Sequence, residues 1–167
     1  MHKVLTRTAL LLALTLLFQS LRFFIPIPPL FSTFIIGSLV NASLLIAAET
    51  VGIWPALLIA AVTPIVAYFQ QLLVLPVFII PVALGNASMV VVYLLTLKFG
   101  KVISVGIAAF TKTCVLYGLF TWLLALVVLP PKVAALLMFV MSWPQFVTGI
   151  IGGILAVLIA KRLKSTL

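Results

Sequence analysis

The chain has 167 residues, of which 66% are hydrophobic and only 7% are charged. A soluble domain of this length could not cover so much apolar surface with polar groups, so the composition indicates an integral membrane protein. The formal net charge is +9, but the basic residues do not cluster with aromatic residues on a polar segment, and nucleic-acid binding is not indicated. A single cysteine, Cys114, excludes an internal disulfide and a cysteine-based metal site, so neither a metal nor a cofactor is expected.

Hydropathy divides the chain into six apolar segments that are long enough to cross a bilayer as helices, at residues 5–21, 33–48, 53–71, 77–97, 102–129 and 133–160. The connections are short, so residues 1–167 are expected to form a single all-α integral membrane domain. The first segment follows Lys3 and Arg7 and therefore has the pattern of a signal peptide as well. Because no small-residue cleavage site follows it, a retained first helix is the favoured interpretation.

The basic residues orient these spans through the positive-inside rule. With a cytoplasmic N-terminus, the outer loops hold Arg22 and Lys132, and the cytoplasmic side holds Lys3, Arg7, Lys98, Lys101, Lys161, Arg162 and Lys164. Five spans would instead separate the two basic termini. The expected topology is six transmembrane helices with the N- and C-termini cytoplasmic.

Prolines interrupt the apolar pattern at two informative places. Pro26, Pro28 and Pro29 predict that residues 22–32 form an extended, apolar loop rather than a helix. Such a loop is either a lid or a simple connector, and the pattern favours neither. Pro64 lies in the middle of the third span, where it should kink the helix and free a backbone carbonyl.

Lys112 is the one basic residue expected inside the membrane. It lies roughly 15 Å from either water phase, from about ten residues at 1.5 Å each, and a lysine stem reaches only about 6 Å. A lysine at this depth costs at least about 3 kcal/mol on insertion scales. The only acidic residue, Glu49, falls in a predicted turn at 49–52 and is not an obvious intramembrane partner. Either an external anion offsets the cost, or the lysine is uncharged and hydrogen-bonded to carbonyl groups.

Other polar side chains are expected in the same layer of the membrane. Counting from the span ends places Asn41, Thr63, Asn86 and Gln145 at a depth similar to that of Lys112. Gln145, Thr148, Gly149 and Gly152 also follow the i, i+3, i+4, i+7 spacing of one helical face, and Gly149 with Gly153 forms a G-x-x-x-G pair. This stripe should face the protein interior, with Trp143 and Pro144 shaping its outer end.

Two interpretations of these polar residues stay open. They either hold helices together through interhelical hydrogen bonds or contact a ligand. Asn41, Thr63 and Thr148 fit the first role better. Asn86, Gln145 and above all Lys112 fit the second.

These features together resemble the S-component, the substrate-binding membrane subunit of an energy-coupling factor (ECF) vitamin transporter. The resemblance extends over the whole chain. Ala9 and Ala13 match the A-x-x-x-A motif on the first helix of that family. Residues 37–42, 63–64, 84–86 and 144–149 are similar to sequence blocks of S-components with no assigned substrate.

The resemblance implies a subunit of an ABC importer in a bacterial or archaeal cell membrane that captures a vitamin or similar micronutrient at the outer face. Ala9 and Ala13 would dock on a transmembrane coupling subunit, and two ATPase subunits would make the S-component topple and release its substrate inside. Loop 22–32, with Pro26, Pro28 and Pro29, and loop 70–76, with Gln70 and Gln71, would cover the pocket. ATP hydrolysis would belong to the partners, so the chain itself is expected to be neither an enzyme nor a cofactor-binding protein.

The substrate is expected to be a small amphipathic anion. Its carboxylate or phosphate would pair with Lys112, Asn86 and Gln145 would orient it, and Asn41, Tyr117, Trp143 and Thr148 complete the candidate substrate-binding residues. The alternative is a small six-helix scaffold of the MreD-like, cell-shape type, which binds partner proteins rather than a solute. A membrane enzyme is disfavoured because acidic and histidine residues for acid–base or metal chemistry are lacking.

Overall fold

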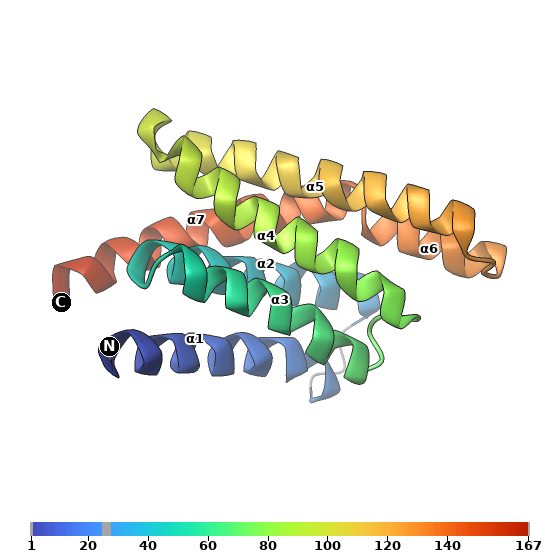
Figure 1. Cartoon of the computed structure of the whole chain (residues 1–167), viewed down its shortest axis with the longest axis horizontal. Coiled ribbons are helices and arrows are strands. Elements are labelled where there is room, and N and C mark those ends of the chain that lie inside the picture. The colour runs from blue at the N-terminus through green and yellow to red at the C-terminus, as the bar shows by residue number, and fades with distance from the viewer. Residues whose placement is uncertain (1, 25–27, 167) are drawn as a thin grey trace.

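The computed structural model describes residues 2–24 and 28–166. In this part of the chain the secondary structure is helical throughout (Figure 1), and the elements follow in the order α1 (His2–Ser20), η1 (Leu21–Phe23), α2 (Pro29–Thr50), α3 (Ile53–Phe69), η2 (Pro76–Phe78), α4 (Ile79–Thr96), η3 (Leu97–Phe99), α5 (Lys101–Leu126), α6 (Pro131–Val140) and α7 (Trp143–Thr166). The labels η1 to η3 denote short 3₁₀ helices.

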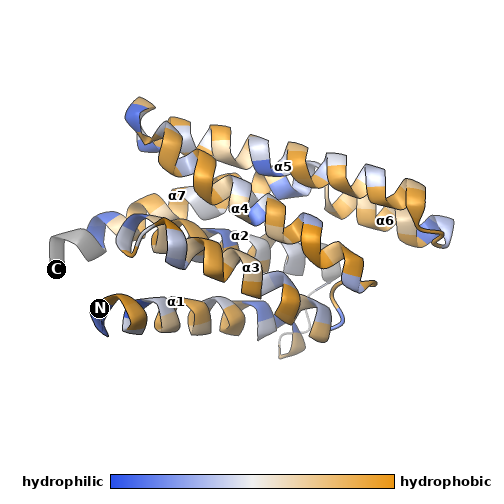
Figure 2. Cartoon of the chain, in the orientation of Figure 1, coloured by the Kyte–Doolittle hydropathy of each residue, from blue (hydrophilic) through white to orange (hydrophobic). Residues whose placement is uncertain are grey.

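The six predicted spans are confirmed. Five helical segments are long and apolar enough to cross a membrane, and α3 is a shorter apolar helix of 17 residues. At 1.5 Å per residue α3 is about 26 Å long, slightly less than the hydrocarbon thickness. In Figure 2 the helices are predominantly hydrophobic, with hydrophilic segments partway along α4 and α5.

The last span differs from the expected continuous helix at 133–160. It breaks at residues 141–142 into α6 and α7, and Pro144 stands at the second position of α7. A proline has no backbone N–H to donate to the carbonyl four residues earlier, and its ring collides with that carbonyl in a regular helix. The carbonyl in question, of Val140, instead accepts a hydrogen bond of 3.1 Å from the side-chain Nε2 of Gln145.

Two predicted turns are shorter than expected. α2 begins at Pro29, which lies in its first turn, because the missing N–H of a proline costs nothing there. The loop expected at 22–32 is therefore reduced, and Leu21–Phe23 adds a short 3₁₀ helix after α1. Likewise, α2 continues through Thr50, so Glu49 lies in a helix and not in the predicted turn at 49–52. Pro26 lies outside the described residues.

Close helix packing uses the glycines of α7. A Cβ atom at Gly152 would strike the Ser38 carbonyl and, at 2.7 Å, the Asn41 side chain on α2, so only glycine permits this approach. A Cβ at Gly149 would lie 2.7 Å from Ala109 on α5, and Gly153 is similarly crowded by Val105. The prediction that this stripe faces the interior is confirmed.

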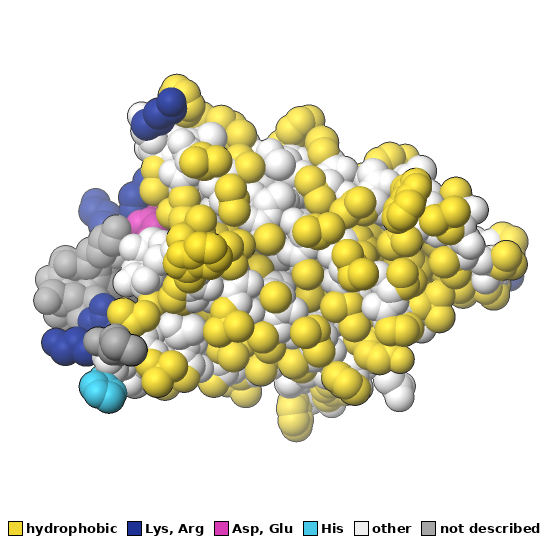
Figure 3. Space-filling model, in the orientation of Figure 1, with side chains coloured by type: hydrophobic (Ala, Val, Ile, Leu, Met, Phe, Trp, Pro, Cys, Tyr) yellow, Lys and Arg dark blue, Asp and Glu magenta, His cyan; other side chains and the backbone are white. Residues whose placement is uncertain are grey.

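Both termini lie at the same end of the bundle (Figure 1), as an even number of crossings requires. Most of the Lys and Arg side chains visible in Figure 3 gather at that end, and the surface between the two ends is largely hydrophobic. The positive-inside rule assigns this end to the cytoplasm. We call it the inner end and the opposite one the outer end.

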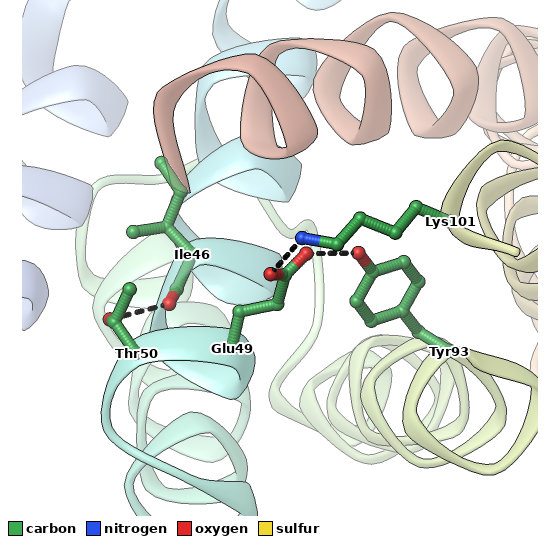
Figure 4. Close-up of polar contacts among 5 residues, drawn as sticks. All are labelled: Ile46, Glu49, Thr50, Tyr93 and Lys101. Atoms are coloured by element: carbon green, nitrogen blue, oxygen red, sulfur yellow. Dashed lines mark hydrogen bonds and ion pairs between the residues drawn. The ribbon is translucent and has the colours of Figure 1, made fainter. Parts of the chain in front are cut away.

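A buried ionic cluster ties three helices together at the inner end (Figure 4). Glu49 on α2 accepts hydrogen bonds from the Tyr93 hydroxyl on α4 and from the Lys101 ammonium on α5. The side chain of Glu49 is 2% exposed and that of Lys101 is 39% exposed. The only carboxylate side chain in the sequence is therefore engaged at the inner end and is not the partner of Lys112.

Candidate functional site

A cavity of about 170 Å³ lies in the outer half of the bundle, where α1 to α5 meet the α6–α7 break. Its apolar lining includes Ile36, Val40 and Val82, and Leu72 and Leu73 contribute from the loop after α3. The polar and charged side chains that line it are Gln19, Arg22, Thr33, Asn41, Thr63, Asn86, Lys112 and Gln145. Two of these are cations, and no carboxylate lines the cavity among the described residues.

Lys112 projects from α5 into this cavity and is 4% exposed. Its Nζ donates hydrogen bonds to Asn41 Oδ1 at 2.6 Å and to Asn86 Oδ1 at 2.8 Å. Both acceptors are neutral side-chain amides, which solvate an ammonium without cancelling its charge. The lysine is thus anchored between α2 and α4, and neither of these contacts is with a carboxylate.

The two asparagines are themselves held in place. Asn41 Nδ2 donates to Thr148 Oγ1 at 3.3 Å, and Thr148 in turn donates to the Gln145 carbonyl at 3.1 Å. Asn86 Nδ2 donates to the carbonyl of Ala60 at 3.5 Å. These bonds use the amide nitrogens and so aim both amide oxygens at Lys112.

The prolines of the sequence explain where these amides bind. Pro64 has no N–H for the Ala60 carbonyl four residues earlier, as predicted, and Asn86 occupies that acceptor. Gln145 does the same for the Val140 carbonyl that Pro144 leaves free. Each proline therefore positions a polar side chain at the cavity.

Four of the predicted substrate-binding residues, Lys112, Asn86, Asn41 and Gln145, line this one cavity. Thr148 is buried behind Asn41 rather than in the lining. Tyr117 and Trp143 are 50% and 52% exposed, and neither lines the cavity.

Trp143 instead packs against the rings of Phe34 and Phe139, next to the α6–α7 break. This places it at the outer end of the polar stripe, as its position before Pro144 predicted.

The predicted lid segments reach the cavity in part. Leu72 and Leu73 of the second loop line it, whereas Gln70 bonds to Ser20 at the end of α1 and Gln71 is exposed with φ of 59°. Pro28, directly before α2, is exposed.

Three polar lining residues, Gln19, Arg22 and Thr33, were missed by sequence reasoning. Thr33 was considered only as the start of the second span. Gln19, within the first span, was given no role, and Arg22 was considered only as a topology charge and as the first residue of the loop 22–32. The spacing of three residues between Gln19 and Arg22 at the end of a helix, which puts them on one face, is the signal that could have found these two.

A larger hollow of about 910 Å³ lies at the inner end, between the beginnings of α1 and α3. Apart from His2 and Thr8 its side chains are apolar, including Leu5, Trp54 and Leu58. It offers no cluster of convergent polar groups, so the smaller polar cavity is the candidate site for a solute.

The fold and the cavity define a multi-pass helical membrane protein with an internal site lined by two basic side chains. Comparison with protein families identifies which one: the family described as ECF transporter, substrate-specific component, matches residues 3–163. The chain belongs to this family. Comparison with curated proteins and with solved structures finds no match.

Family membership confirms the resemblance carried by Ala9, Ala13 and the polar blocks. The chain is a substrate-specific transport subunit that works with an ECF energy-coupling module. A substrate-specific subunit binds a solute, whereas the MreD-like scaffold considered as the alternative would bind partner proteins.

Proposed function

We propose that this subunit captures a small amphipathic anion at the outer face of the cell membrane and delivers it to the cytoplasm when an ATPase module is coupled to it. The observation that carries the proposal is the placement of Lys112. The residue is 4% exposed and lines the cavity, and its Nζ touches only neutral acceptors among the described residues. A substrate acid group is the simplest counter-ion for it.

The geometry of the lysine leaves room for that contact. An ammonium has three N–H donors, and Asn41 and Asn86 take two of them. The third is free to donate to a carboxylate or phosphate oxygen. Because the amide oxygens hold Nζ in position beforehand, little side-chain entropy is lost when the anion binds.

The rest of the lining supports an amphipathic substrate. Arg22 provides a second positive charge, which favours the entry of an anion. Ile36, Val40 and Leu73 offer apolar surface for the remainder of the molecule. Arg22 in η1 and Leu73 in the loop after α3 belong to segments that are suited to cover the bound solute.

Partner docking is proposed for the outward face of α1. Ala9 and Ala13 are one turn apart and exposed, so the helix offers a flat strip to a transmembrane coupling subunit. Two ATPase subunits would supply the energy for toppling and release. Small residues permit close helix approach, whereas larger side chains at these positions would hold the partner away.

Native mass spectrometry of the purified subunit tests the proposal. The wild type is expected to carry a small molecule that ionises in negative mode after release. Lys112→Met should lose it, and Lys98→Met, which removes an exposed lysine at the inner end, should keep it. Equal occupancy in wild type and Lys112→Met would refute the role of Lys112.

A further inference from the structure

Gln19 contributes an unused acceptor to the cavity. It lies in the last turn of α1, is 3% exposed and lines the cavity. Its Nε2 donates to the Thr63 carbonyl at 3.3 Å, while its Oε1 is buried without a hydrogen-bond partner among the described residues. Buried side-chain acceptors of proteins are paired in the large majority of cases, so this atom needs an explanation.

The orientation of the Gln19 amide is fixed by its neighbour. The Thr63 carbonyl can only accept, so the nitrogen of the amide must face it and the oxygen must point elsewhere. The two cations of the cavity do not supply the donor. Lys112 donates to Asn41 and Asn86, and Arg22 Nε donates to the backbone carbonyl of Gln19 at 3.4 Å.

Gln19 and Lys112 belong to helices on opposite sides of the bundle. Figure 1 shows α1 and α5 separated by the helices between them. Both side chains nevertheless line one cavity of about 170 Å³. A molecule whose acid group meets Lys112 therefore presents a different part of itself to Gln19.

We propose that Gln19 Oε1 accepts a hydrogen bond from a hydroxyl or amino group of the transported anion. The inference rests on the proposed function and narrows its substrate class to small acids with a hydrogen-bond donor at the end remote from the acid group. Gln19 then determines specificity, because an acid without that donor leaves the buried acceptor unpaired.

Two matched pairs of probes test this inference: benzoate with 4-hydroxybenzoate, and 3-phenylpropanoate with 3-(4-hydroxyphenyl)propanoate. Each pair differs by one hydroxyl donor, and the pairs differ in length. Affinities are measured by titration of the purified, emptied subunit at up to millimolar concentrations. Wild type is expected to bind the hydroxylated member of at least one pair about fivefold to tenfold more tightly, the value of one net hydrogen bond.

Variants show whether the preference for the hydroxylated acid depends on Gln19 itself or on a general change in the fold. Gln19→Met should bind both members of the pair equally, so the readout is a ratio of affinities within one protein. Thr15→Val, which alters a buried hydroxyl one turn earlier on α1, should keep the preference.

The outcomes also separate this inference from the proposed function. If wild type shows no preference in either pair, or Gln19→Met keeps the preference, the role of Gln19 is overturned and that of Lys112 stands. If Lys112→Met binds the unsubstituted acids as tightly as wild type, or none of the four acids binds wild type, the proposed function fails and the inference fails with it.

Discussion

Removal of the Lys101 ammonium at the inner end should destabilise the protein. Removal of the Glu49 carboxylate in addition should restore part of the lost stability. Lys101→Met removes the ammonium that pairs with the Glu49 carboxylate, which is 2% exposed. Breaking a fully buried pair in this way costs about 3–5 kcal/mol. The cost here is smaller, because Lys101 is 39% exposed and Tyr93 still donates to the carboxylate.

From these contacts we expect Lys101→Met to lower the free energy of unfolding by about 2 kcal/mol, which lowers the Tm of a chain of this size by about 4–8 °C. The double variant Lys101→Met/Glu49→Gln buries no charge and should be more stable than Lys101→Met alone. Lys98→Met, at an exposed position near the same end, should stay within about 0.5 kcal/mol of wild type.

Thermal unfolding in a single detergent, followed by circular dichroism, measures all four proteins. The decisive comparison is whether Glu49→Gln raises or lowers the stability of the Lys101→Met variant, not the absolute Tm of either protein. If the double variant is less stable than Lys101→Met, the carboxylate is not a buried charge that needs its cation. The inner-end cluster would then have a role other than the one deduced from its burial.

Three further predictions concern packing, docking and the site. Gly152→Ala should lower the free energy of unfolding by about 1–3 kcal/mol, because the added Cβ would meet the backbone of α2. Gly106→Ala is the control: it has open space around it and should be neutral or stabilising. Equal effects of the two substitutions in thermal unfolding would contradict the packing. The double variant Ala9→Leu/Ala13→Leu should no longer co-purify with the coupling subunit and the ATPases, whereas Gly118→Leu, on the open face of α5, should still do so. If the α1 variant still co-purified with these partners, this docking face would be excluded. Asn86→Asp should place a carboxylate 2.8 Å from the Lys112 Nζ, where it competes with the bound anion. The occupancy of the anion, measured by native mass spectrometry, should fall about 10-fold or more. Unchanged occupancy would show that Lys112 does not need an external counter-ion.

Hydropathy and charge were sufficient to predict the six spans and their orientation, because both depend on composition along the chain rather than on contacts. Depth was also informative. Counting residues from the span ends brought Lys112, Asn86 and Gln145 to one layer, and all three line the same cavity. Tyr117 shows the limit of this method, because depth does not fix the side of a helix and its side chain is 50% exposed.

The break in the last span could not be read from hydropathy, because apolar residues continue on both sides of it. Pro144 was the signal, and it was interpreted as shaping the end of the polar stripe rather than as ending a helix. The bonds of Asn86 and Gln145 to carbonyls freed by prolines join residues that meet only after folding or across a helix break. The partners of Lys112 were unpredictable for the same reason: Asn41 is 71 residues away along the chain.

The affinity of the subunit for its own co-purified molecule tests the central claim most directly. The molecule is released from denatured wild type and titrated into emptied wild type, Lys112→Met and Lys98→Met. A charge-assisted hydrogen bond in the buried cavity predicts binding about 10- to 100-fold weaker in Lys112→Met and unchanged in Lys98→Met. Affinities of wild type and Lys112→Met that agree within about threefold, a difference below the value of one hydrogen bond, would contradict the claim that Lys112 binds the transported anion.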